Sequence, residues 1–334
     1  MNVRPHLIAT AIAVGIAALI AAPHADAQTK AKSLPKTAWG DPDIAGVYAE
    51  FTTAPLERPA ELGTQEFFSS RDQWQTYAQK RLKEVDQDVE TVPGTQEDVH
   101  YDMGTFQLSE NEGSTSLNMR TSIVVMPKNG RIPPLTQAAT ARRDAAAAAR
   151  KGHEFDGPEY RSLTERCVVW PSTLAPILPR GYNSNLQIFQ SPGYVIIQGE
   201  MGDPRMIPTD GRARPKDGLP QWNGTSIGRW EGDTFVVETA GFNRETAWRN
   251  STENLRVTER FKRIDDKSLE YSFTVVDPDT WAEPWSGVYP LTKMDGLLFE
   301  YACTEGNYGM ANILAGERKA ERDAAAHKTA APAK

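Results

Sequence analysis

The sequence predicts a mainly β protein, in which an antiparallel barrel follows an N-terminal segment of loops and one or two helices. From about Leu186 onward, short runs rich in β-branched and aromatic residues succeed one another, with turn residues between them and no helical stretch. The part of the chain before them carries two stretches of helical character. Regularly spaced short strands are typical of a meander that closes or nearly closes, here calycin-like in outline.

The predicted barrel region spans residues 161–316. Each of its runs is expected to form one strand, because β-branched and aromatic residues favour a pleated, half-buried surface. The runs are LQIFQ (186–190), GYVIIQGE (193–200), RMIPTD (205–210), SIGRWEG (226–232), DTFVVETAGF (233–242), NLRVTERFKRID (254–265), KSLEYSFTVVD (267–277), WSGVYPLT (285–292) and LLFEYAC (297–303).

A wrapping segment, residues 28–160, is expected to form one compact domain with the barrel. Residues 41–59 indicate a strand and a loop, since Pro and Gly interrupt their apolar pieces. Residues 67–88 predict an amphipathic helix with Ser70 as its N-cap. The apolar side chains of that helix recur at near-helical spacing, at Phe68, Trp74, Tyr77 and Leu82.

Further elements are predicted on either side of the barrel. Residues 116–135 predict a strand, a turn at 128–131 and a short second strand that Pro133 and Pro134 stop. The alanine-rich run 138–152 predicts a second helix, which Gly152 would end. Residues 317–334 are rich in Ala and Lys and predict a flexible tail.

The first 27 residues have the pattern of an export signal. Arg4 and His6 precede an apolar run at 7–22, and Ala25 and Ala27 supply a small-x-small cleavage site. No other run approaches the ~20 apolar residues of a membrane helix. We therefore expect cleavage near Ala27, a periplasmic or secreted location and no membrane insertion.

Charge and composition restrict the partners. The formal net charge is -7 and the pI is about 5.4, and the Lys and Arg residues are dispersed among acids. Binding to a phosphate backbone needs a concentrated basic face. We therefore do not expect nucleic acid as a partner. We expect a small-molecule ligand or substrate. The oligomeric state stays open.

The cysteines are Cys167 and Cys303. An oxidising compartment favours a disulfide between them, and two buried free thiols are the alternative. Neither residue resembles a catalytic thiolate, because no histidine is available to activate it.

Metal and cofactor motifs are missing from the sequence. The histidines after the signal, His100, His153 and His327, lie far apart and form no cluster with cysteine. No glycine-rich phosphate loop or dinucleotide fingerprint occurs. We expect neither a redox metal, zinc nor a cofactor, while a calcium ion held by carboxylates and carbonyls stays open.

The segment Gly224-Thr225-Ser226-Ile227-Gly228 fits the G-x-S-x-G pattern of a nucleophilic serine. That motif needs a strand before the serine and a helix after it, and here a turn and a strand follow. The only later histidine is His327 in the predicted tail. We therefore interpret both glycines as turn glycines and exclude a serine hydrolase.

Strand parity indicates which polar residues face the barrel interior. Leu255, Val257, Glu259 and Phe261 share one apolar face. A second face is shared by the alternate residues Leu269, Tyr271, Phe273, Val275 and Asp277, with Asp277 at its rim, and Val236 shares a face with Glu238. An inward carboxylate either gains a raised pKa and acts as an acid or base, or pairs with an arginine. Arg180, Arg205 and Arg212 are the available partners.

Loops at a barrel mouth are where binding residues gather. Glu200, Arg205 and Asp210 surround a strand end, and Arg180, Tyr182 and Asn183 form a polar loop before the strands. Tryptophans near turns are either core anchors or stacking walls for a ring-shaped ligand; they are Trp222, Trp230, Trp281 and Trp285.

Several segments together resemble a large, mainly uncharacterised family of secreted bacterial proteins. The resemblance covers most of residues 163–321 and implies no established activity. The segments that carry it are ERCVVW (165–170), LPRGYNSNLQIFQSPGYVIIQGEM (178–201), RMIPTDGR (205–212), WNGTSIGRWEGDTFVVET (222–239), GFN (241–243), ENLRVTERFKRID (253–265) and EYACTEGNYGMANILAGERKAE (300–321). Members of that family often carry His where this chain has Thr304. An acid or base role of that histidine therefore cannot be assigned to this chain.

The predicted function is that of a cofactor-independent enzyme with lyase or isomerase chemistry on a small amphipathic ring compound. Proton abstraction needs only a positioned base and a group that stabilises the developing anion. The catalytic candidates are Glu259 as base and Tyr182 or Tyr308 as proton donor. The predicted substrate-binding residues are Arg180, Asn183, Glu200, Arg205, Trp222, Asn243, Trp285, Glu305 and Asn307. A lipocalin-like binding protein is the alternative.

Overall fold

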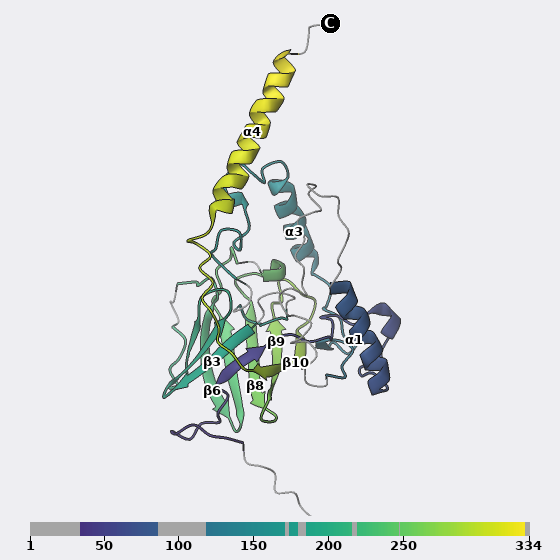
Figure 1. The fold of residues 1–334 in the computed structure, drawn as a ribbon, viewed down its shortest axis with the longest axis vertical. Helices are drawn as coiled ribbons and strands as arrows, with labels where there is room; N and C mark the ends of the chain where they lie inside the picture. The colour runs from purple at the N-terminus through teal and green to yellow at the C-terminus, as the bar shows by residue number, and fades with distance from the viewer. Residues whose placement is uncertain are drawn as a thin grey trace, which may run out of the picture. The chain divides into compact units, whose positions relative to one another are not determined.

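The computed structural model describes residues 34–85, 118–170, 174–179, 185–215, 219–246 and 248–330 (Figure 1). Its helices are α1 (Arg71–Val85), α3 (Gln137–Arg150) and α4 (Tyr308–Ala330). Its strands are β1 (Gly46–Ala49), β2 (Val124–Met126), β3 (Asn185–Ser191), β4 (Tyr194–Gly199), β5 (Arg205–Pro208), β6 (Thr225–Glu231), β7 (Thr234–Ala240), β8 (Arg256–Arg263), β9 (Ser268–Val276) and β10 (Trp285–Met294). Short 3-10 turns lie at Ala60–Leu62, Pro158–Tyr160 and Trp248–Asn250.

The strands form one antiparallel sheet that is nearly closed into a barrel. Neighbours follow the order β5-β4-β3-β1-β10-β9-β8-β7-β6, and β2 pairs with β10. The two end strands meet through side chains: Arg205 Nη2 on β5 donates to Ser226 Oγ on β6 at 3.3 Å. The predicted antiparallel barrel with additional helices is therefore confirmed.

Alternating residues of the strands fill the inside of the barrel. Leu255, Val257, Glu259 and Phe261 are all buried, as strand parity predicts. Asp277 is buried too, where its carboxylate accepts the Thr252 amide at 2.7 Å and the Thr280 hydroxyl at 2.8 Å. Large aromatic side chains occupy most of the remaining interior, namely Phe235, Phe273, Tyr271, Tyr289 and Trp285.

Glycine makes room for these rings at two strand positions. A Cβ at Gly228 would lie 2.6 Å from the Phe235 ring, and one at Gly287 would lie 2.4 Å from the Phe273 ring. Gly224, in contrast, has φ +67° and lies before β6. Our interpretation of Gly224 as a turn glycine fits the structure, whereas for Gly228 it is wrong, because Gly228 lies within β6.

A non-strand segment completes the core. Leu174, Ala175 and Ile177 are buried among the inward-facing side chains. The Ile177 amide donates to Tyr271 Oη at 2.9 Å, and Tyr289 Oη donates to the Ile177 carbonyl at 3.2 Å. The segment around Ile177 thus occupies part of the space inside these strands.

Two strand predictions are wrong. Residues 297–303 form no strand, and Leu297 and Phe299 are each 77% exposed. The preceding strand, β10, already pairs with β9 and β1, so it has no free edge beside which this run could continue the meander. Within the described residues 118–135, the predicted first strand is present as β2 and a turn follows it, since the Gly130 amide donates to the Pro127 carbonyl at 2.9 Å. The predicted second strand does not form: β2 pairs with β10, and the segment after the turn contains Pro133 and Pro134, which lack amide donors.

The helices begin where the sequence indicates. Ser70 Oγ accepts the Gln73 amide at 3.1 Å before α1, and Thr136 Oγ1 accepts the Ala139 amide at 3.0 Å before α3. Gly152, just after α3, has φ +82°. Among the described residues, the C-terminal segment differs most from expectation: α4 runs without a break through residue 317, where we expected a flexible tail to begin. No helix in the described ranges is long and apolar enough to cross a membrane.

Candidate functional site

The inward carboxylate of Glu259 is held in an ion pair. Arg205 Nη1 donates to its Oε1 at 3.0 Å, and Arg205 Nη2 pairs with its Oε2. Tyr271 Oη donates to Oε1 at 2.9 Å. Glu259 is 0% exposed and Arg205 is 4% exposed. Both carboxylate oxygens therefore have partners, and the side chain has no contact with solvent.

Burial and this ion pair together shift the pKa values of Arg205 and Tyr271. Burial lowers the pKa of Arg205, but the charge and hydrogen bonds of Glu259 outweigh burial and raise it. Burial, and next the charge of Glu259, raise the pKa of Tyr271 well above its usual value. The geometry is that of the structural alternative, a satisfied Glu-Arg pair inside the barrel, and it offers no proton acceptor to a substrate.

Ser226 belongs to the same buried network. Its Oγ lies 2.8 Å from Thr239 Oγ1, and both hydroxyls accept from Arg205 Nη2. No histidine is among these partners. Arg205 and Ser226 also line a cleft of about 360 Å³ at the seam between β5 and β6, but the serine faces a cation instead of a base.

Several predicted site residues have structural roles. Trp285 is 0% exposed and stacks on Trp248 with ring centroids 6.0 Å apart, so it is a core anchor. Asn243 caps a turn, since its Oδ1 accepts the Glu245 amide at 2.9 Å. The Trp222 carbonyl accepts the Thr246 hydroxyl at 2.8 Å. Tyr308 is 76% exposed at the start of α4.

Arg180, Tyr182 and Asn183 lie outside the described residues. Arg212 is described and pairs with Asp210 through Nη2, on the exposed surface. Arg212 therefore does not reach Glu259, and of the described arginines that we considered, Arg205 is the one that pairs with it.

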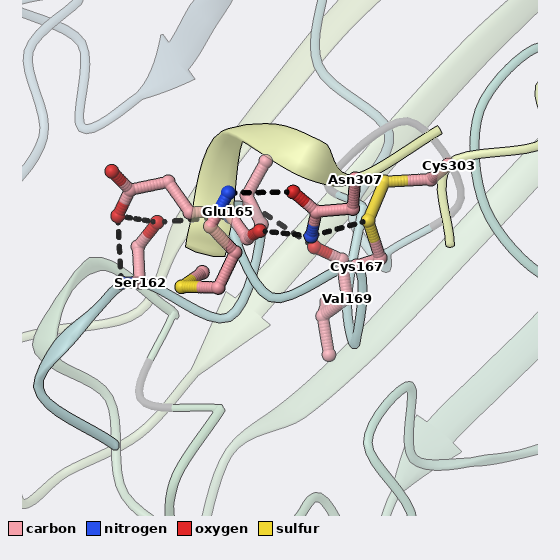
Figure 2. Close-up of a disulfide and its surroundings, with 8 residues drawn as sticks. Ser162, Glu165, Cys167, Val169, Cys303 and Asn307 are labelled. Atoms are coloured by element: carbon pink, nitrogen blue, oxygen red, sulfur yellow. Dashed lines mark hydrogen bonds between the residues drawn. A yellow bond between two sulfur atoms is a disulfide. The ribbon is translucent and has the colours of Figure 1, made fainter. Parts of the chain in front are cut away.

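The predicted disulfide is present. Cys167 and Cys303 are bonded, with their Cα atoms 5.8 Å apart and a separation of 136 positions in sequence. Figure 2 shows the Asn307 side chain between the two joined segments: its Nδ2 donates to the Glu165 carbonyl at 2.9 Å and to Cys167 Sγ at 3.4 Å. Asn307 Oδ1 also accepts the Met310 amide at 3.2 Å, so Asn307 links the disulfide to the first turn of α4.

A cleft of about 480 Å³ lies beside this disulfide. Its lining includes Gln187 and Phe189 of β3 and Gln198 of β4, which alternate with the buried residues of these strands. The segment 298–305, Trp170 and Cys167 also line it. The predicted residues Glu200 and Glu305 both line it, so the structure brings together two candidates that are far apart in sequence.

Among the carboxylates that line this cleft, Glu200 has a shifted pKa. It follows β4 and is half-buried. Its Oε2 accepts the Asn185 amide at 3.3 Å and Asn185 Nδ2 at 3.1 Å. Burial raises the pKa of Glu200, and the Asn185 bonds offset part of that rise. In the described part of the chain, no hydrogen bond is made to Oε1.

Sequence reasoning missed the aromatic side of the cleft. Trp170 and Tyr301 meet edge to face, with centroids 5.3 Å apart and planes at 83°. Phe189 and Phe299 also line the cleft and are exposed. The signal available in the sequence was that Trp170 and Tyr301 each lie within three positions of a cysteine of the predicted disulfide.

Comparisons of the chain with protein-family models, with curated proteins and with solved structures give no match. The resemblance to a family of secreted bacterial proteins therefore stays a prediction from the motifs. Within the described ranges, no group of His, Cys, Asp and Glu side chains converges as a metal site would require.

Proposed function

We propose that this protein binds a small amphipathic organic compound in the cleft beside the Cys167–Cys303 disulfide, and not inside the barrel. The observation that carries the proposal is the cleft itself: about 480 Å³, with aromatic side chains and carboxylates facing the same space. This volume lies within the ~300 to 1,000 Å³ that is typical of ligand sites. The disulfide supports the cleft because it fixes two of its borders to each other.

A protein-observed NMR titration with a library of small aromatic and carbohydrate compounds tests this proposal. Ligands should shift the Trp170 indole and the amides of Ala302 and Thr304. Glu200→Gln should weaken binding of ligands that donate a hydrogen bond, while the exposed control Glu283→Gln should not. Ligands that shift only residues elsewhere would overturn the proposal.

A second candidate function is acid/base catalysis, with Glu200 in the role that we first assigned to Glu259. Two observations favour Glu200: burial raises its pKa, and its Oε1 has no hydrogen bond within the described residues. A base with a raised pKa transfers protons more effectively near neutral pH. Lyase or isomerase chemistry on a ring compound needs no nucleophile and so suits this group.

Mass spectrometry of products separates the catalyst from the carrier. The exported protein is incubated with small aromatic and carbohydrate compounds, and the mixture is searched for new masses. A product that folded wild-type protein forms and Glu200→Gln does not would support catalysis. Ligands that come back unchanged from both proteins would leave binding as the function and contradict catalysis.

We also propose that the protein is exported to the periplasm or beyond, with cleavage after Ala27. A disulfide is typical of oxidising compartments, and the first residues have the composition of a signal peptide. The intact mass of protein recovered from a periplasmic fraction should correspond to a chain that starts at Gln28. Recovery of the uncleaved chain from the cytoplasm would contradict the proposal.

A further inference from the structure

We infer that the ligand of this cleft is an organic cation, an amine or quaternary ammonium carried on an apolar or aromatic body. The inference rests on the proposed function and specifies its ligand class. It comes from the charges and rings that line the cleft, taken together.

All the charged side chains that line the cleft in the described structure are acidic. They are Glu200, Asp203, Glu300 and Glu305. The basic residues of the neighbouring loop, Arg161 and Arg166, line a different cleft of about 510 Å³. The loop that carries Cys167 thus has arginines that line one cleft and a tryptophan that lines the other. The charged side chains that line the cleft beside the disulfide would repel an anionic ligand.

The acidic side chains of the rim are free to act on a ligand. Asp203, Glu300 and Glu305 are exposed, and none of them forms an ion pair or hydrogen bond with another described residue. Unpaired carboxylates around one concave site raise the local concentration of cations and favour their binding. Neutralising them with a ligand removes their mutual repulsion, a gain that a neutral compound cannot provide.

The rings provide the second half of a cation site. Trp170 and Tyr301 pack edge to face, with their planes at 83°, and both line the cleft. Aromatic faces attract ammonium groups through the ring quadrupole, most strongly Trp, and proteins use aromatic rings to recognise quaternary ammonium ligands. Phe299 and Phe189 extend the apolar surface for the body of the ligand. The combination of aromatic rings and carboxylates in one lining matches a cation with an apolar body better than a phenol or a sugar.

Three matched probes test the inference by calorimetry on the full mature protein: 2-phenylethylamine, 2-phenylethanol and 3-phenylpropanoate. Their rings are the same, and their polar ends are cationic, neutral and anionic. We expect the amine to bind at least about tenfold more tightly than the alcohol, and the acid most weakly. The preference for the amine should shrink in about 1 M salt, where the screening length falls to ~3 Å.

Variants attribute the preference to the cleft. Replacing Glu300 and Glu305 together by Gln keeps the shape and removes two charges, so it should reduce amine affinity by up to about fivefold per carboxylate and leave alcohol affinity unchanged. Tyr301→Leu should reduce amine affinity about two- to fivefold. Glu283→Gln, an exposed carboxylate outside the cleft, is the matched control and should change neither.

The outcomes distinguish this inference from the proposed function. Equal affinity for amine and alcohol, both weakened by Trp170→Leu, would overturn the cation inference and leave the binding cleft standing. Preference for the amine that survives the loss of Glu300 and Glu305 would also overturn it. If none of the probes binds, and NMR finds no small molecule that shifts cleft residues, both fall.

Discussion

Glu259 and Glu200 are the same residue type in two regions of the molecule and differ in what surrounds them. Glu259 lies inside the barrel, fully buried, with Arg205 and Tyr271 on its oxygens. Glu200 lies on the outer side, half-buried in a cleft, with Asn185 on one oxygen. The difference shows that burial alone does not make a carboxylate available for chemistry. Whether the carboxylate can react depends on its hydrogen-bond partners and on its access to a ligand.

The two regions also differ in how they are stabilised. The barrel interior is filled by large rings, by glycines placed under two of them and by the segment around Ile177. The cleft beside β3 and β4 is bordered by an irregular segment that a disulfide and the Asn307 side chain attach to the rest. Substitutions in the interior should therefore affect folding, and substitutions in the cleft should affect binding.

The largest effect is expected from loss of the disulfide. Replacing Cys167 and Cys303 together by Ser should lower the free energy of unfolding by about 4 to 5 kcal/mol, as expected for a loop of more than 100 residues. The cause is greater freedom of the unfolded chain. Urea unfolding of the double variant and of reduced wild-type protein measures it. A loss below about 1 kcal/mol would show that the bond does not constrain the unfolded state as the chain-entropy model requires.

The next largest effect tests the interior pair. Glu259→Ala leaves the Arg205 cation buried without its partner, which should cost about 3 to 5 kcal/mol. The double variant Glu259→Leu with Arg205→Met removes both charges and should recover most of that loss. Chemical unfolding of both variants provides the comparison. A Glu259→Ala protein as stable as the wild type would mean that water reaches and solvates the Arg205 guanidinium. The barrel interior would then be less closed to solvent than described.

A smaller effect is expected at Gly228. Gly228→Ala would put a Cβ 2.6 Å from the Phe235 ring and 2.9 Å from Ile207. The ring must move, so we expect a loss of about 1 to 3 kcal/mol. Gly232→Ala is a useful contrast, because nothing lies near its Cβ and the effect there arises from φ +61° alone. Thermal unfolding of both variants separates close packing from backbone strain.

The smallest effect concerns the pH dependence of Glu200. Burial raises the pKa of Glu200 in the folded protein, so the folded state keeps this proton to higher pH than the unfolded chain does. Its ionised form therefore lowers stability above the unfolded pKa. Glu200→Gln should raise stability slightly at pH 7, and the gain should vanish below about pH 4, where Glu is protonated in both states. A gain that persists or grows at low pH would contradict this sign.

The sequence predicted the barrel well, because strand parity and strand length are local properties. The face shared by Val257, Glu259 and Phe261 could be found by counting alternate residues. The run 297–303 could not be placed, because its composition suits a strand while the edges of β10 are taken by β1 and β9, which is a matter of topology. Site prediction was weaker for the same reason: Trp170 and Tyr301 meet only after the chain folds and the disulfide closes.

The central claim is that ligands bind in the cleft beside the disulfide and not in the barrel. A titration of isotope-labelled protein with 2-phenylethylamine, followed by NMR, tests it most directly. The account predicts shifts at the Trp170 indole and at Tyr301, Ala302 and Thr304, with none at the interior residues Tyr271 and Phe261. Saturable shifts at Tyr271 and Phe261, with the cleft unchanged, would contradict the account and return the site to the barrel.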